Sequence, residues 1–313
     1  MKYIIKKLIT LIITLLFITL ITFTAFSVIP GDAAAARLGT NATPEQVEAL
    51  REEMGLNDPL PQRYVNWLRG AIRGDFGDSY QYDTSTVASL LADRLPVTAI
   101  LAVLSLVIIV VVSIPLGILS ARYAGKWLDT LINQLSQITM AVPAFFLGIL
   151  LTYIFGLILA WFQPGAFVDP SVSFWGCVSY LIFPAIAVAL PKIAMVVKFL
   201  RNSILSEMPK DYVCTAFSKG NREGRVLYVH ILRNALIPVI TFIAMVIAEI
   251  MAGSIIVEQV FGIPGMGQLL ITSISARDYP VVQAIVTYIT AIVVIVNFVV
   301  DILYRLVDPR VKA

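Results

Sequence analysis

The sequence predicts an all-α, polytopic membrane protein with six transmembrane helices and both termini in the cytoplasm. Of its 313 residues, 58% are apolar and only 14% are charged, which is too apolar for the soluble chain of about two domains that the length alone would suggest. The apolar residues form blocks of about 20 residues or more, the length that a helix needs to cross a bilayer. Most of the Lys and Arg residues outside one long polar region lie in alternate connections between these blocks.

Residues 1–30 contain the first predicted span, an apolar run over residues 8–29 that follows three lysines. A cleaved signal peptide is the alternative, because the alanines at 33–36 could form a cleavage site. The run is longer than the apolar core of a usual signal peptide. We therefore expect a retained N-terminal transmembrane helix.

Residues 31–96 form a polar region that we expect to be an external loop or cap. One helix is predicted in it: Thr43 caps the helix, Pro44 suits its first turn, Gln46 completes a capping box and Gly55 ends it. The many acidic residues of this region are interpreted as a solvated face, because they form no catalytic cluster.

The remaining spans are expected at about 97–119, 131–161, 180–200, 237–260 and 281–303. Proline interrupts backbone hydrogen bonding, so Pro143 should kink or break the third span. The fourth span contains two further prolines, Pro184 and Pro191. Residues 97–306 would thus form a transmembrane core, and residues 307–313 a cytoplasmic tail.

The distribution of positive charge sets the expected orientation. Lys and Arg concentrate at the N-terminus, in the 120–130 loop, between residues 192 and 233 and at the C-terminus. Most of the others lie in the long 31–96 region, which the positive-inside rule discounts. The rule therefore places both termini in the cytoplasm, and an even number of spans agrees with this.

Residues 211–238 carry the densest basic cluster of the chain and separate two predicted spans. We expect two short helices that meet at Gly220 in the left-handed conformation, with Asp211 capping the first and Asn221 the second. The small residues Ala216 and Gly220 would let another surface come close. The alternative is an amphipathic loop that lies on an anionic membrane surface.

Several kinds of active site are missing from the sequence. It holds no G-x-x-x-x-G-K-[ST] phosphate loop, no H-E-x-x-H and no G-x-S-x-G motif. A single histidine, His230, and two cysteines leave no metal cluster of the His/Cys type. The topology puts Cys177 and Cys214 on opposite sides of the membrane, so no disulfide between them is expected. An intramembrane enzyme, the alternative from another class, would need a nucleophile and base or a metal set inside the membrane, and the single cytoplasmic-side histidine and the lack of an acid pair argue against it. If ATP powers the protein, another chain binds it.

Several motifs together resemble one family. The pattern D-Y-V-x-T-A-x-x-K-G at 211–220, followed by H-x-L-R-N-A-L-I-P at 230–238, resembles the cytoplasmic coupling motif of bacterial ABC importer permeases of the dipeptide/oligopeptide/nickel family. The resemblance covers nearly the whole chain, through the motifs P-G-D at 30–32, M-G-L at 54–56, G-D-F-G at 74–77, R-L-P at 94–96, V-P-A-F-F at 142–146, V-E-x-x-F-x-x-P-G-x-G at 257–267, R-D-Y-P at 277–280 and D-P-R at 308–310. One departure is Cys214, which stands where the wider importer motif often has an acid.

The resemblance implies a type I ABC importer permease in the bacterial inner membrane. Residues 201–235 would form the cytoplasmic coupling loop. The expected partners are a second homologous permease, two ABC ATPase subunits that use ATP and Mg²⁺, an extracytoplasmic substrate-binding protein and membrane lipid, with no nucleic acid. This chain itself would bind no cofactor or metal and would be a transport subunit, not an enzyme. The cargo would be di- or oligopeptides moved by alternating access, with nickel or a nickel chelate as the alternative. The expected contacts to the ATPase are Asp211, Tyr212, Thr215, Ala216, Lys219, Gly220 and Arg225.

Polar residues inside spans are costly and are often functional. Glu249 lies near the middle of the fifth span, where it could line the substrate pathway or pair with a partner helix. Asn133 and Gln137 of the third span are further pathway candidates, and Asp301 of the sixth span is expected to pair with an arginine. Five residues are expected to shape an external turn or gate: Glu258, Gly262, Pro264, Gly265 and Gly267.

Overall fold

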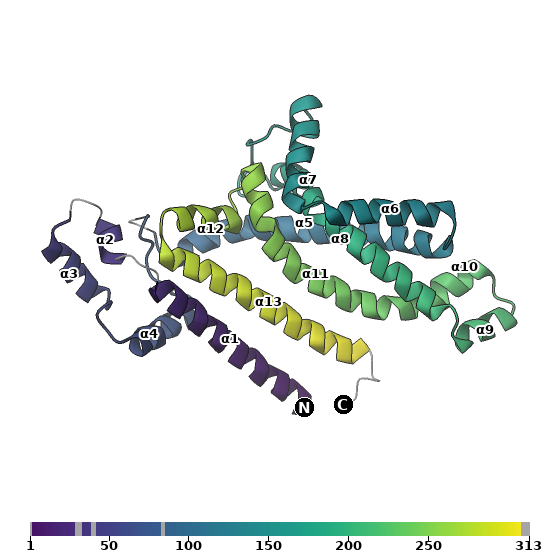
Figure 1. The fold of residues 1–313 in the computed structure, drawn as a ribbon, viewed down its shortest axis with the longest axis horizontal. Helices are drawn as coiled ribbons and strands as arrows, with labels where there is room; N and C mark the ends of the chain where they lie inside the picture. The colour runs from purple at the N-terminus through teal and green to yellow at the C-terminus, as the bar shows by residue number, and fades with distance from the viewer. Residues whose placement is uncertain (1, 29–32, 39–41, 83–84, 308–313) are drawn as a thin grey trace. The chain divides into compact units, whose positions relative to one another are not determined.

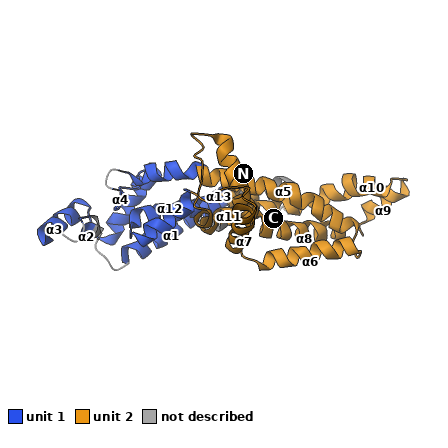
Figure 2. Ribbon diagram, turned by 90° about the horizontal axis from the view of Figure 1, so that it is seen from above, with its two compact units in different colours: residues 1–96, 264–295 blue, residues 97–263, 296–313 orange. Residues whose placement is uncertain are grey.

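The computed structural model describes residues 2–28, 33–38, 42–82 and 85–307 (Figure 1). In these ranges the chain is helical apart from its loops and one isolated β-bridge between Asp78 and Thr86, which confirms the all-α prediction. The chain divides into two compact units (Figure 2). Unit 1 comprises residues 1–96 and 264–295, and unit 2 comprises residues 97–263 and 296–313.

Unit 1 is built from helices of both ends of the chain. The helices are α1 (Lys2–Val28), α2 (Ala33–Leu38), α3 (Pro44–Glu53), α4 (Leu60–Ile72), the start of α5 (Val87–Arg122), α12 (Met266–Ser275) and the first part of α13 (Tyr279–Val307). Phe23 of α1 packs against Tyr64 and Trp67 of α4, with ring centroids 5.5 and 5.7 Å apart. A second apolar cluster joins α5, α12 and α13 through residues that include Val87, Leu269 and Ile285.

The predicted capping box of α3 is confirmed. The Gln46 backbone N–H donates to Thr43 Oγ1 at 3.3 Å, and the Thr43 N–H donates to Gln46 Oε1 at 3.0 Å. Helix α4 was not predicted, because prolines at its start and a glycine inside it are typical of loops. A proline at the first helical positions costs no hydrogen bond, however, and Pro61 occupies such a position.

A buried carboxylate joins distant parts of the sequence in unit 1. Asp278 is fully buried just before α13, and it accepts hydrogen bonds from the Ser79 hydroxyl and from the Tyr80 N–H at 3.1 Å. The bonds anchor the loop before α5 on the start of α13. Asp278 lies in the R-D-Y-P motif, so this motif has a structural role inside unit 1.

Unit 2 is arranged around helix α8 (Phe174–Glu207), whose buried residues extend from Cys177 to Ile204. The other elements are α6 (Trp127–Ala141), α7 (Ala144–Leu151), the π-helix η1 (Thr152–Ile158), α9 (Asp211–Ser218), α10 (Glu223–Arg225), the π-helix η2 (Val226–Ile231) and α11 (Leu232–Phe261), with the remainder of α5 and α13. Helices α6, α7 and α11 all pack on α8, and Figure 1 shows α6 and α11 running along it. A helix covered on several sides needs a broad apolar surface, which α8 supplies through buried residues that include Leu181, Val188 and Leu200.

The predicted break at Pro143 is confirmed. Helix α6 ends at Ala141, α7 begins at Ala144, and the two axes differ by 99°. Pro143 has no N–H to continue the first helix, and its carbonyl instead accepts from Phe146 and Leu147 at 3.1 Å, which starts the second.

Among the described residues, five helices are long and apolar enough to cross a membrane, or up to seven candidate spans if each of two bent helix pairs counts as one. Helix α5 starts earlier than the predicted span, at Val87 and ahead of Pro96, because Thr86 accepts from the Ser89 N–H at 3.2 Å and Val87 is buried in unit 1. Six spans, their orientation and the four-part division of the chain stay predictions.

Candidate functional site

The first arm of the segment between α8 and α11 is helix α9. Its N-cap residue is Lys210, which makes no side-chain cap, so the prediction that Asp211 caps the helix is wrong. Asp211 occupies the first helical turn, where a negative charge interacts favourably with the helix dipole. Val213 and Ala216 are the buried residues of the helix and face the rest of unit 2.

Gly220 forms the turn after α9, as predicted. Its φ of +76° lies in the left-handed region that favours glycine, and its N–H donates to Phe217 O at 2.8 Å. Asn221 does not cap the next helix: its side-chain amide donates back to Ala216 O at 2.9 Å, and Arg222 stands at the next N-cap. Gly220 and Asn221 therefore terminate α9, and neither of them begins the second arm.

The second arm is not a separate short helix. It begins as α10, passes through η2 and continues into α11, so that residues 223–251 count as one apolar helix. Val226, Leu227 and Ile231 are buried on its inner side, in the same apolar cluster as Val213. A displacement of the turn at Gly220 would thus act directly on α11.

Polar contacts fasten this segment to the end of α8. Tyr212 donates its hydroxyl hydrogen to Glu207 Oε2 at 2.8 Å, and Lys210 forms an ion pair with the same carboxylate. Ser203 Oγ donates to Ala235 O of α11 at 2.9 Å. Burial raises the pKa of the Tyr212 hydroxyl above its ordinary value, so Tyr212 stays protonated and keeps donating to Glu207.

The outer face of the segment exposes both charged and apolar side chains. Of the seven predicted ATPase contacts, Asp211, Thr215, Lys219, Gly220 and Arg225 are exposed and Tyr212 is half-buried. Three large hydrophobic side chains are also exposed to solvent: Phe217 is 48% exposed, Tyr228 52% and Val229 53%. We call the exposed residues of 211–229 the coupling surface.

Ala216 does not belong to the coupling surface, because it is only 6% exposed. The close approach that its small side chain permits is to the chain's own helices. The space expected for another surface is instead found at Gly220, where an added Cβ would meet no described residue within 4 Å. The sequence did not identify Phe217 and Tyr228 as outward-facing, because the direction in which an apolar side chain of a short helix points depends on how the helix packs.

Glu249, the main pathway candidate, forms an ion pair with Lys192 of α8. Both residues lie near the middle of their long helices. The Glu249 side chain is 48% exposed and the Lys192 side chain 21% exposed. The ammonium group of Lys192 therefore compensates the negative charge of Glu249. The pair still presents a polar spot in the middle of an otherwise apolar helix pair.

Comparisons with known proteins agree with these features. Residues 113–313 match the sequence model of the family "Binding-protein-dependent transport system inner membrane component", and residues 1–102 match the model of its N-terminal part. The chain belongs to this permease family. It is 34% identical over 312 residues to the "Probable peptide ABC transporter permease protein y4tP" of Sinorhizobium fredii and 36% identical over 312 residues to the "Oligopeptide transport system permease protein AppB" of Bacillus subtilis. Each alignment covers 99% of both chains.

Family membership identifies the protein as a permease component of an ABC importer and as a multi-pass protein of the bacterial cytoplasmic membrane. Transport of this kind depends on a binding protein, which implies ATPase and substrate-binding partners for the permease. The candidate spans found in the structure agree with this location.

Two further pathway candidates lie on α6 of the permease. Asn133 is half-buried, and its side-chain amide donates to the Asp129 carbonyl at 2.8 Å and to Asp129 Oδ1 at 2.7 Å. Gln137 lies one turn later and is exposed. A role of either residue toward substrate stays a prediction.

The predicted turn residues fall at the end of α11 and the start of α12. In unit 2, Glu258 is fully buried and accepts from Thr98 Oγ1 at 2.7 Å, and Gly262 ends α11 in the left-handed conformation. In unit 1, the Pro264 carbonyl accepts from Arg94 at 3.4 Å, and Gly265 and Gly267 are buried at the start of α12. A function as an external gate stays a prediction.

Some predicted features lie outside the described residues. These are the P-G-D motif at 30–32 and the D-P-R motif at 308–310, together with the side chain of Asp301. Their expected roles stay predictions.

Proposed function

We propose that this permease imports di- or oligopeptides by alternating access, driven by ATPase subunits that dock on the coupling surface. The observation that carries the proposal is the shape of the 207–238 segment. It combines an open glycine turn, exposed aromatic residues and a second arm that continues into a long apolar helix. A surface with aromatic anchors and nearby positive charge is typical of a protein-binding site.

The proposed topology has six spans, formed by α1, α5, the bent pair α6 with α7–η1, α8, α11 and α13. Both termini and the coupling surface would lie in the cytoplasm, and residues 31–96 would lie outside. Residues 97–306 would be the permease core, in line with the positive-inside distribution of Lys and Arg. The complete transporter would contain a second homologous permease, two ATPases that bind ATP and Mg²⁺, and an external binding protein.

Peptide is favoured over nickel as cargo for two reasons. The relatives reported above carry peptide or oligopeptide transport in their names. A bare nickel cation would rely on the negative charge of Glu249, and Lys192 compensates that charge. A charge-neutral polar pair fits a zwitterionic peptide in the pathway better than a bare metal cation.

Co-purification with the ATPase subunits tests the docking proposal. Replacing Phe217 with Ala should weaken binding of the ATPases at least tenfold, or about 1.4 kcal/mol, as expected for an aromatic anchor. Phe174→Ala is the matched control, because Phe174 is exposed to a similar degree, 53% against 48%, but belongs to the far end of α8. Equal co-purification of both variants with the ATPases would argue against the coupling surface.

A further inference from the structure

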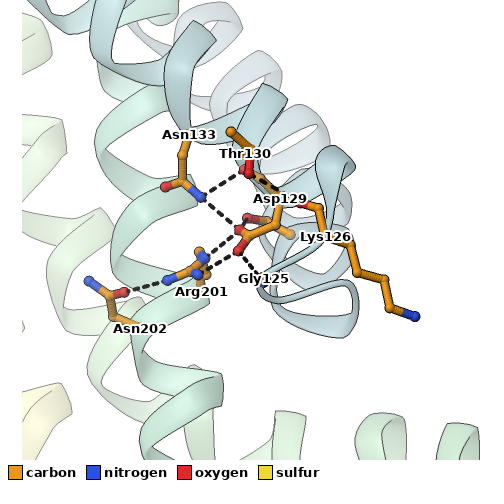
Figure 3. Close-up of polar contacts among 8 residues, drawn as sticks. Gly125, Lys126, Asp129, Thr130, Asn133, Arg201 and Asn202 are labelled. Carbon is orange, nitrogen blue, oxygen red and sulfur yellow. Dashed lines mark hydrogen bonds and ion pairs between the residues drawn. The ribbon is translucent and has the colours of Figure 1, made fainter.

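A buried polar network lies at the start of α6, and its residues are separate from those of the coupling surface. The Asp129 side chain is only 5% exposed. Its carboxylate accepts from Arg201 Nε and Nη2, both at 2.6 Å, in the two-pronged geometry typical of strong Arg–carboxylate pairs (Figure 3). It also accepts from Ser120 Oγ at 2.6 Å, from the Gly125 N–H at 2.9 Å and from Asn133 Nδ2 at 2.7 Å.

The donors come from separate elements of unit 2. Ser120 belongs to the last turns of α5, Gly125 to the turn that follows, Asn133 to α6 and Arg201 to α8. One carboxylate therefore joins three helices at a single point. The backbone of α5 also comes very close to an α8 side chain beside the network, since a Cβ added to Gly117 would lie 2.8 Å from Leu200 Cδ2.

Arg201 of the network lies shortly before residues 207–238 in the chain, which we call the coupling segment. Arg201 is six residues from the end of α8 at Glu207, a distance of about 9 Å along a helix axis. Over these same turns, Ser203 holds α11 and Glu207 holds α9. The end of α8 is thus fastened to α5 and α6 on one side and to both arms of the coupling segment on the other.

Stability alone does not explain this arrangement. A buried ion pair loses hydration on folding, and apolar residues of similar size often stabilise a protein equally well or better. A charged pair with every carboxylate oxygen engaged does fix the relative position of its helices, because any shift breaks several hydrogen bonds at once. Rigid connection of helices is what transmission of a movement requires.

We propose that Asp129 and Arg201 are positioning residues that make the adjoining ends of α5, α6 and α8 move as one body when the coupling segment is displaced. This inference depends on the proposed docking of ATPases at the coupling surface. The pair would carry the displacement from α8 to α6, and so to the bent α6–α7 span.

The test uses the complete transporter in proteoliposomes and measures both ATP hydrolysis and peptide uptake. Asp129→Asn keeps the size of the side chain but removes its charge. We expect assembled complex that still hydrolyses ATP, with the number of peptides imported per ATP reduced roughly tenfold, equivalent to about 1.4 kcal/mol of lost coupling. Arg201→Lys, which retains charge but loses the two-pronged contact, should give an intermediate ratio.

The control is Glu48→Gln, which removes an exposed ion pair with Arg51 on α3 and should leave the ratio unchanged. If Asp129→Asn lowers hydrolysis and uptake in equal proportion, the pair is merely structural and the proposal is wrong. If the unmodified transporter shows no ATP-dependent uptake, the proposed function fails instead, so the two failures are distinguishable.

A second measurement does not depend on the folding of an Asp129 variant. Spin labels at the exposed positions Gln134 on α6 and Ser206 on α8, in a chain without its native cysteines, report the distance between the two helices. We expect the same distance distribution in the nucleotide-free and ATP-bound transporter. A shift between the two states would show that α6 and α8 move separately and would overturn the proposal.

Discussion

Two substitutions of Gly220, to Ala and to Trp, distinguish the effect of backbone strain on ATPase binding from the effect of steric overlap with a docked ATPase. The φ of +76° costs any L-residue roughly 1–2 kcal/mol, and this cost is nearly the same for Ala and Trp. Among the residues that the structure describes, a Cβ at this position meets nothing within 4 Å. A difference between Gly220→Ala and Gly220→Trp therefore comes from another molecule.

The size of that difference follows from packing. Forcing an extra side chain into a well-packed contact costs about 1–3 kcal/mol. Gly220→Trp should thus bind the ATPase subunit roughly 5- to 150-fold more weakly than Gly220→Ala does. The assay is a titration of purified ATPase onto the permease in nanodiscs, with binding followed by fluorescence.

Gly74 supplies the matched control. It has a φ of +83° and open space around it, but it belongs to the 31–96 region that we place outside the cell. Gly74→Trp should carry the same strain and leave ATPase binding unchanged. The reasoning would be refuted if Gly220→Ala and Gly220→Trp bound the ATPase equally, or if Gly74→Trp weakened binding as much as Gly220→Trp.

Three further predictions follow from the same structure. A membrane-impermeant maleimide should label the exposed Cys214 only from the cytoplasmic side, while the buried Cys177 stays unlabelled. Labelling of Cys214 in intact cells would contradict the proposed topology. Tyr180→Phe removes a hydroxyl that donates to the Phe261 carbonyl at 2.6 Å and accepts from the Gly165 N–H. The loss should reduce the free energy of unfolding by about 1–3 kcal/mol and lower the melting temperature of the purified permease, and an unchanged melting temperature would contradict this. Gly117→Ala should destabilise the folded permease by about 1–3 kcal/mol through its clash with Leu200, as measured in the same thermal assay. An unchanged melting temperature would mean that α5 and α8 can separate at no cost.

Local signals in the sequence predicted several elements correctly. The capping box at Thr43, the break at Pro143 and the left-handed turn at Gly220 depend on residues within a few positions of each other. Caps, breaks and turns of this kind are decided by backbone sterics and local hydrogen bonds. The sequence alone is therefore sufficient for them.

The features that the sequence could not predict depend on contacts between distant residues. Lys192 and Glu249 are separated by 57 positions, and Asp129 and Arg201 by 72, so no periodicity connects them. Which face of a short helix turns inward also depends on its neighbours, as the burial of Ala216 illustrates. Pairings of this kind are fixed by how α6, α8 and α11 pack.

The central claim is that ATP hydrolysis by partner subunits drives peptide through this permease. The most direct test is uptake of labelled peptide into proteoliposomes that hold the complete transporter, with ATP inside and loaded binding protein outside. We predict accumulation of peptide that requires both ATP and the binding protein, with no comparable uptake of nickel. Peptide entry that is equal without ATP, or accumulation of nickel alone, would contradict the account.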